Sequence, residues 1–157
     1  MHKLISTITG IGLLETLSTV LIISFGLVGL ATLQTKNTAS LNNSIMAMKA
    51  TFYAQDIVQK MAGNVSIARN TDGYVLNSYT NTPTIAAATP ICVTTICTPD
   101  QLAIFDMNIW LQKIKNDLPN GKAQITKESS AGNILYTIQI QWQYKTDIRT
   151  YQLVVQI

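Results

Sequence analysis

Apolar and polar positions follow different periods along this chain, and the first long apolar segment lies near the N-terminus. Residues 16–35 (TLSTVLIISFGLVGLATLQT) are a run of twenty uncharged positions. As a helix with a rise of about 1.5 Å per residue, this run spans roughly 30 Å, which matches the hydrocarbon core of a bilayer. The pattern therefore predicts a membrane-spanning helix.

Three interpretations of this apolar segment are open. It can be the core of a secretory signal peptide, because small residues near Gly29 and Ala31 would permit cleavage there. It can also be a plain signal anchor. Neither explains why the acidic Glu15 stands at the start of the segment, so a third interpretation has to give this carboxylate a role.

The next segment, residues 36–62, contains neither proline nor glycine and is rich in helix-forming residues. Joined to the apolar segment, it predicts one helix from Ile11 to about Ala62, on the order of 75–80 Å long at 1.5 Å per residue. Gly26 and Gly29 lie inside this helix. Each costs roughly 1 kcal/mol of helical stability relative to alanine, so we expect the helix to loosen there first.

Two apolar stripes run along roughly opposite faces of the second half of this helix, with spacings of three and four residues. The helix is either buried on nearly all sides, or it packs one face on its own domain and the other on neighbouring subunits. We prefer the second interpretation. One stripe consists of Leu41, Ile45, Met48 and Phe52, and the other of Met46, Ala50, Tyr53, Ile57 and Met61.

Residues 63–97 show no clear period, and their turn, Thr/Asn and Pro signals predict an exposed loop with a short strand. Cys92 and Cys97 enclose the sequence VTTI. A disulfide over so small a loop would stabilise the fold by roughly 2 kcal/mol. Two free buried cysteines are the expectation for a cytosolic protein, whereas a membrane segment that delivers the domain outside favours the disulfide. We expect the disulfide.

A second helix is predicted directly after the cysteines. Thr98 suits the N-cap, Pro99 the first helical position and Asp100 the positive end of the helix dipole. The run Pro119-Asn120-Gly121 ends the helix, and Trp110 on its apolar side is expected in the core.

The last third predicts an antiparallel meander. Residues 122–127 form one short strand, and apolar residues alternate with Thr and Gln in residues 134–144 and again in 151–157. SSAGN and KTDIR are the connecting turns. The fold class expected is therefore α+β, with a long N-terminal helix packed on a small antiparallel β-sheet and a second helix.

Composition and charge argue against catalysis. The 157 residues are only 12% charged, with a net charge of +3, and the basic residues are scattered, so no nucleic-acid partner is evident. The single histidine is His2, and removal of a leader would leave none for a catalytic triad or a metal site. Two cysteines cannot complete a zinc site. We expect no enzyme, no catalytic residue, no metal and no cofactor.

The segment TGIGLLETLSTVLIISFGLVGLATLQ resembles the N-terminus of type IV pilins, which carry a short leader ending in glycine and a glutamate at the fifth mature residue. Gly10 matches the last leader residue, Ile11 the first mature residue and Glu15 the glutamate. The resemblance implies cleavage between Gly10 and Ile11 by a prepilin peptidase, followed by N-methylation of Ile11.

Two further stretches are similar to PilV-type minor pilins: SFGLVGLATLQ, and CTPDQLAIFDMNIWLQKIKNDLPNG followed by YTIQIQW. The resemblance implies a minor pilin that contributes to type IV pilus assembly, and through it to adhesion, twitching motility or DNA uptake. Its partners would be the prepilin peptidase and, through the N-terminal helix, major and minor pilins. It would reside in the inner membrane of a Gram-negative bacterium with a periplasmic head domain, and then in the extracellular pilus.

Two alternatives stay open: a pseudopilin of a type II secretion system, and a membrane-anchored periplasmic domain of unrelated function. The pilin resemblance implies four regions. They are a prepilin leader (1–10), a transmembrane and filament-core half of the long helix (11–35), an amphipathic half (36–62) and a globular α+β head (63–157).

Within this resemblance Glu15 has a role in assembly. A carboxylate in the hydrocarbon region costs a few kcal/mol, unless Glu15 lies at headgroup level near the helix start. The amine of Ile11 on an adjacent subunit would neutralise it. At about 4 Å and an effective dielectric near 20, the pair attracts by roughly 4 kcal/mol before desolvation.

Overall fold

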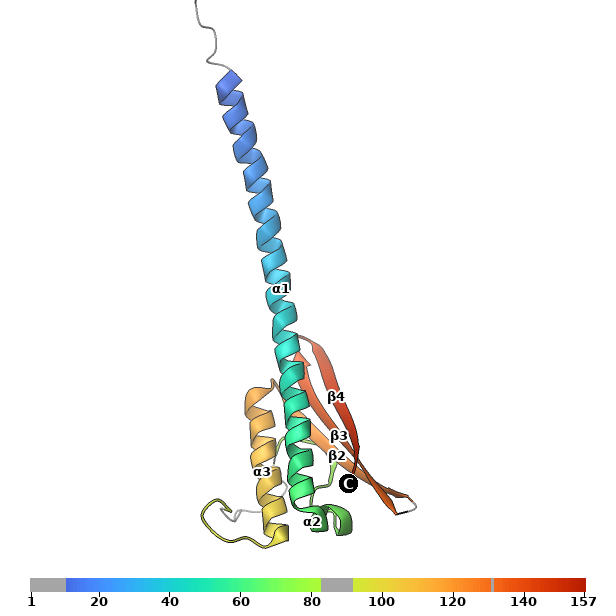
Figure 1. Cartoon of the computed structure of the whole chain (residues 1–157). Coiled ribbons are helices and arrows are strands. Elements are labelled where there is room, and N and C mark those ends of the chain that lie inside the picture. The colour runs from blue at the N-terminus through green and yellow to red at the C-terminus, as the bar shows by residue number, and fades with distance from the viewer. Residues whose placement is uncertain (1–10, 83–91, 131) are drawn as a thin grey trace, which may run out of the picture. The chain divides into compact units, whose positions relative to one another are not determined.

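The computed structural model describes residues 11–82, 92–130 and 132–157, without the side chains of Ile11, residues 35–40 and Ser130 (Figure 1). The predicted leader, residues 1–10, lies outside the described residues. The chain divides into two compact units at Asn42 and Asn43. The elements in order are α1 (Ile11–Gly63), α2 (Val65–Asn70), β1 (Leu76–Thr80), α3 (Pro99–Asp117), β2 (Lys122–Ser130), β3 (Asn133–Tyr144) and β4 (Asp147–Gln156).

The fold is α+β, with an N-terminal apolar helix and a four-stranded antiparallel sheet in the order β1-β2-β3-β4. The predicted long helix is observed as α1, a single 53-residue helix that continues through Gly26 and Gly29. In the unit that begins at Asn43, the end of α1 and the whole of α3 run side by side against the sheet (Figure 1).

Helix α3 begins and ends as the sequence predicts. The Thr98 hydroxyl accepts a hydrogen bond from the backbone N–H of Gln101, whose side chain in turn accepts one from the Thr98 N–H, which makes a complete capping box. After the helix, a Cβ at Gly121 would lie 2.4 Å from the carbonyl oxygen of Ile114. Only glycine permits this close return of the chain, so Gly121 fixes the path into β2.

Residues 63–97, which were predicted to form a loop with a short strand, also contain a short helix, α2. This corrects the prediction. Helix α2 has no side-chain cap, although it begins after Asn64. The Asn64 amide nitrogen donates to the carbonyl oxygen of Pro99 at 2.7 Å and to the hydroxyl of Tyr74 at 3.3 Å. Ile67 and Ala68 of α2 are buried. Tertiary contacts, rather than a local start signal, hold this turn in place.

The strands are longer than predicted. β2 extends to Ser130, and β4 begins at Asp147, inside the segment expected to be a turn. The loop between β3 and β4 is only Lys145 and Thr146, because Lys145 adopts a left-handed backbone with φ of 55°. Asp147 therefore already pairs with Tyr144.

The core lies between one face of the sheet and the two helices. Its fully buried side chains include Trp110, as predicted, together with Ile57 from α1 and Tyr136, Ile138 from β3. One row of inward residues crosses the whole sheet, and its cross-strand pairs are Leu76 with Ile125, Ile125 with Ile138, and Ile138 with Leu153.

Candidate functional site on helix α1

The first part of α1 is apolar and entirely uncovered. Residues Gly12–Gln34 are long and apolar enough to cross a membrane by length and composition, and none of this span is buried. Its exposed fractions include 71% for Ile22 and 75% for Phe25. An apolar surface of this size needs a lipid or protein environment to cover it.

The hydroxyl groups in this span are satisfied within the helix itself. Thr16 donates to the carbonyl oxygen of Leu13 at 3.0 Å, Ser18 to that of Glu15 at 2.9 Å, and Ser24 to that of Val20 at 2.7 Å. A hydroxyl that bonds back to its own helix exposes no unsatisfied donor. These residues therefore add little cost in an apolar environment.

Glu15 is the only charged side chain between Gly12 and Gln34. It lies one helical turn after Ile11, is exposed, and makes no ion pair with another residue that the structure describes. Gly10 of the predicted cleavage site lies outside the described residues, and of Ile11 only the backbone, at the start of α1, is described. A cationic partner for Glu15 would therefore come from outside the described part of the chain.

Of the two apolar stripes on the second half of the helix, one is buried and the other is exposed. Tyr53 is 6% exposed and Ile57 and Met61 are fully buried, whereas Met48 is 72% and Phe52 63% exposed. The rest of the exposed stripe is Leu41 and Ile45, and Ala50 and the partly buried Met46 complete the other. The prediction that one stripe packs on its own domain is confirmed. That the other stripe packs on neighbouring subunits stays a prediction.

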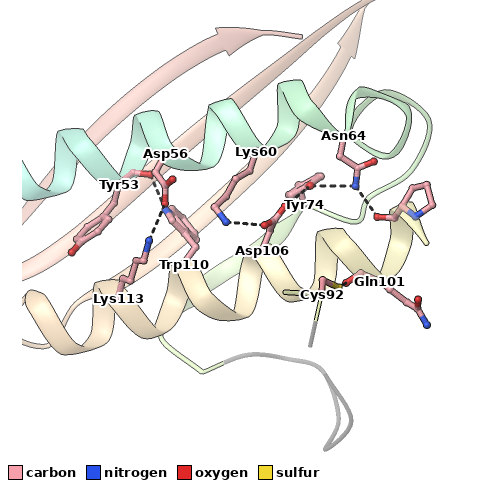
Figure 2. A network of polar contacts seen from close by, with 11 residues as sticks. Tyr53, Asp56, Lys60, Asn64, Tyr74, Cys92, Gln101, Asp106, Trp110 and Lys113 are labelled. Carbon is pink, nitrogen blue, oxygen red and sulfur yellow. Dashed lines mark hydrogen bonds and ion pairs between the residues drawn. The ribbon is translucent and has the colours of Figure 1, made fainter. Parts of the chain in front are cut away.

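Polar contacts to α3 hold the buried face of α1 in register (Figure 2). Lys60 Nζ lies 2.7 Å from Asp106 Oδ1, with side chains 23% and 10% exposed. One helical turn away, Trp110 Nε1 donates to the carbonyl oxygen of Tyr53 at 2.7 Å. These contacts fix the rotation of α1 on the head, and so determine which stripe points outward.

The network continues at both ends of the α1–α3 interface. The Tyr53 hydroxyl donates to the carboxylate of Asp117, and burial, reinforced by this bond, raises the pKa of Tyr53 to about 12. At the other end the Tyr74 hydroxyl donates to Asp106 Oδ2 at 3.2 Å. Burial, opposed by the bond from Asn64 and reinforced by the charge of Asp106, raises the pKa of Tyr74 to about 12. Both tyrosines therefore act as neutral donors.

The predicted disulfide is confirmed. Cys92 and Cys97 are bonded, with their Cα atoms 5.5 Å apart. Inside the loop that they close, Val93 is 79% exposed and Ile96 is fully exposed. The disulfide ends one residue before Thr98, so it ties this loop to the N-terminus of α3.

A cleft lies between β1 and α3, with a volume of about 760 Å³. Its apolar lining includes Leu76 from β1 and Ile104, Met107 and Leu111 from α3. Among the described residues, no group of three or more His, Cys, Asp or Glu side chains could hold a metal ion.

Comparisons with protein-family models, curated proteins and solved structures found no match to this chain.

Sequence reasoning missed two parts of this site. The capping-box partner Gln101 had a signal, because threonine followed three residues later by glutamine is the known pattern. The pair of Lys60 with Asp106 had none, since 46 positions separate the two residues.

Proposed function

We propose that this chain is a filament subunit of the type IV pilin class, a minor pilin that contributes to pilus assembly. The observation that carries the proposal is the uncovered apolar surface of α1. It comprises the span Gly12–Gln34, of which none is buried, and the stripe at Ile45, Met48 and Phe52 that the head domain leaves exposed.

Such a surface suits a subunit that exchanges one apolar environment for another. In the membrane, lipid would cover Gly12–Gln34. In a fibre, the same side chains would pack against the corresponding helices of neighbouring major and minor pilins, and burial of apolar area at about 25 cal/mol per Å² would stabilise the assembly. The exposed stripe on the head extends the surface available for these contacts.

Cleavage of the leader would make the membrane-held subunit competent for assembly into the fibre. A prepilin peptidase would cut after Gly10 and create a cationic amine at Ile11, which would then be methylated. That amine on one subunit would neutralise Glu15 on the next. The disulfide supports a head outside the cytoplasm, where disulfides persist. The subunit would reside in the inner membrane with a periplasmic head and then in the extracellular pilus.

Mass spectrometry of the native protein tests the processing step. The proposal expects a mature chain that begins at Ile11 and carries one additional methyl group on its amine. A native chain that still begins at Met1, or that begins after Gln34, would overturn the proposal.

The role of Glu15 is tested by its substitution. Glu15→Ala removes the counter-charge and should lower the amount of subunit in sheared fibres about tenfold, which corresponds to a net loss of roughly 1.4 kcal/mol, while cleavage of the leader continues. Ser18→Ala is the matched control, because Ser18 is exposed on the next turn and bonds only to its own helix. Normal incorporation of the Glu15→Ala subunit would contradict the assigned role.

A further inference from the structure

Strand β4 is an unprotected edge of the sheet. It is ten residues long, it pairs with β3 without a bulge, and no second strand pairs with it among the residues that the structure describes. Residues 150–157 (TYQLVVQI) contain no charge, proline or glycine. Exposed edges are usually blunted by such residues or by bulges, because free backbone groups pair with other chains. From Thr150 onward this edge lacks these protections, because the only charges of β4, Asp147 and Arg149, stand at the start of the strand.

The apolar face of the sheet is also incomplete at β4. Tyr136, Ile138 and Ile140 of β3 are fully buried. Their neighbours on the inward face of β4 are only partly covered, although they pack on the same core. The apolar surface thus extends beyond its cover. The inward residues of β4 are Tyr151, Leu153 and Val155, followed by Ile157.

The opposite edge of the sheet offers space of a matching kind. β1 is the other edge strand, and its five residues (LNSYT) carry no charge. Its register against β2 shifts between Leu76 and Thr80, so the pairing proposed below is anchored at the Leu76 end. The cleft of about 760 Å³ opens beside it, between Leu76 on the strand and Ile104 and Met107 on α3. An apolar row brought next to β1 would lie over this lining.

We propose that β4 of one copy of this protein pairs antiparallel with β1 of a second copy, so that the two sheets join head to tail. With Leu153 opposite Leu76 of the second copy, the inward row that crosses the sheet continues without a step. The half-covered row of β4 then meets the cleft beside β1. In this register Gln152 faces Asn77 on the outward side.

The direction of the strands favours this pairing over a two-fold pairing of β4 with β4. The sheet has four antiparallel strands, so an antiparallel addition at β4 places the next copy in the same orientation as the first. A two-fold axis perpendicular to the sheet would instead reverse the helix that packs on it. Head-to-tail contacts repeat along an array. In the array formed by this contact, residues 43–63 of α1 point in the same direction in every copy.

Cysteine cross-linking tests the pairing in the full-length protein, reconstituted in vesicles of phosphatidylethanolamine and phosphatidylglycerol. One preparation carries Asn77→Cys and the other Gln152→Cys, both outward positions on edge strands. The mixture should form at least tenfold more linked dimer than either variant alone. Thr150→Cys and Val154→Cys, mixed in turn with Asn77→Cys, cover a register shift of two residues.

Two controls make the result specific. Gln112→Cys, exposed on α3, mixed with Gln152→Cys measures random collision in the membrane. Val154→Lys puts a charge on the edge and should lower the Asn77–Gln152 cross-link about tenfold. Thr137→Lys adds the same charge to the cross-strand neighbour on β3 and should leave the cross-link unchanged.

Three outcomes would overturn the proposal. The first is a mixture that links no better than the Gln112→Cys control in any of the three registers. The second is Gln152→Cys alone linking as well as the mixture, which would show β4 pairing with itself. In the third, Thr137→Lys lowers the cross-link as much as Val154→Lys does. Failure here would leave the role of α1 intact, because that role is read from the mature N-terminus and from Glu15.

Discussion

Two stretches of the same helix, Gly12–Gln34 and residues 43–63 of α1, both carry large apolar side chains but have different surroundings. The first contains a single charge and no buried side chain. The second contains Lys49, Asp56 and Lys60, and all three contact α3: Lys60 pairs with Asp106, Asp56 with Lys113, and Lys49 donates to the Asp117 carbonyl oxygen at 3.5 Å.

The difference shows what apolar residues alone can and cannot specify. A helix that is apolar on all sides has no preferred rotation against a partner, so it suits lipid or several neighbouring helices equally well. A helix with polar residues between its stripes is held at one rotation, because a buried polar group must find its partner. Residues 43–63 therefore belong to the same compact unit as the head, Asn43–Ile157, whereas Gly12–Gln34 is available to partners outside it.

The largest expected effect separates the two stretches by one substitution made in each. Ile57→Ala, at a fully buried position, should lower the free energy of unfolding of the head by about 2–5 kcal/mol, through lost burial and a cavity. Ile22→Ala, at a position 71% exposed, should change it by less than about 0.5 kcal/mol.

The measurement is urea unfolding of the full-length protein in detergent micelles, followed by tryptophan fluorescence. Trp110 and Trp142 are the only tryptophans and both lie in the head, so the signal reports on that unit. Equal destabilisation by the two substitutions would show that Gly12–Gln34 also supports the head, and would end the distinction drawn between the stretches.

A somewhat smaller effect is expected at the polar contacts that fix the rotation of α1. Asp106→Ala leaves Lys60 without its partner in a mostly buried position, and should cost roughly 3 kcal/mol in the same unfolding assay. Asp56→Ala is the matched comparison. It breaks a 3.7 Å pair with Lys113 that is more exposed, and we expect about 0–1 kcal/mol. The reverse order would mean that the Lys60 pair does not fix the helix.

The smallest effect concerns alkaline pH and should be confined to the head. Tyrosine ionises near pH 10 in an unfolded chain, whereas burial, reinforced by the charge of Asp72, raises the pKa of Tyr136 to about 12. Between these values the folded state keeps a proton that the unfolded state has lost. Stability therefore falls as pH rises, by roughly 1 kcal/mol per tyrosine at pH 11.

Tyr136→Phe should accordingly flatten the loss of unfolding free energy between pH 9 and pH 11 by about 1 kcal/mol. The change in slope is the relevant quantity, since the substitution also removes the 2.7 Å bond from the Tyr136 hydroxyl to the Ala68 carbonyl oxygen at every pH. An unchanged slope would show that Tyr136 does not contribute to alkaline sensitivity. Residues 12–34 contain no tyrosine or lysine, so no comparable sensitivity is expected there.

Elements with a strong local signal could be predicted from the sequence. The second half of α1 followed from the absence of proline and glycine in residues 36–62 and from their periodicity, and the start of α3 followed from Thr98 and Pro99. The disulfide followed from the spacing of two cysteines after a predicted membrane segment. The alternation in residues 134–144 placed β3 and its inward side chains, because a period of two leaves no choice of face.

Elements that depend on distant residues could not be predicted in this way. Helix α2 has no local cap, and the residue before it, Asn64, is held by the Pro99 carbonyl oxygen, 35 positions along the chain. The start of β4 at Asp147 depends on Lys145 accepting a left-handed backbone, which non-glycine residues adopt only at a cost. In both cases a gain elsewhere in the fold offsets a weak local preference.

The sequence by itself determined that α1 carries two apolar stripes and a single acidic residue in an apolar span. It also determined that the sheet has one apolar face. Only the tertiary structure decided that Tyr53, Ile57 and Met61 face the core while Met48 and Phe52 face outward. The stripe that faces outward is no less apolar than the one that is buried, so burial of apolar area alone does not explain which stripe faces the core. The rotation of α1 is set by directional contacts that only one orientation of the helix can make. Examples are the ion pair of Lys60 with Asp106 and the hydrogen bond from Trp110 to the Tyr53 carbonyl oxygen.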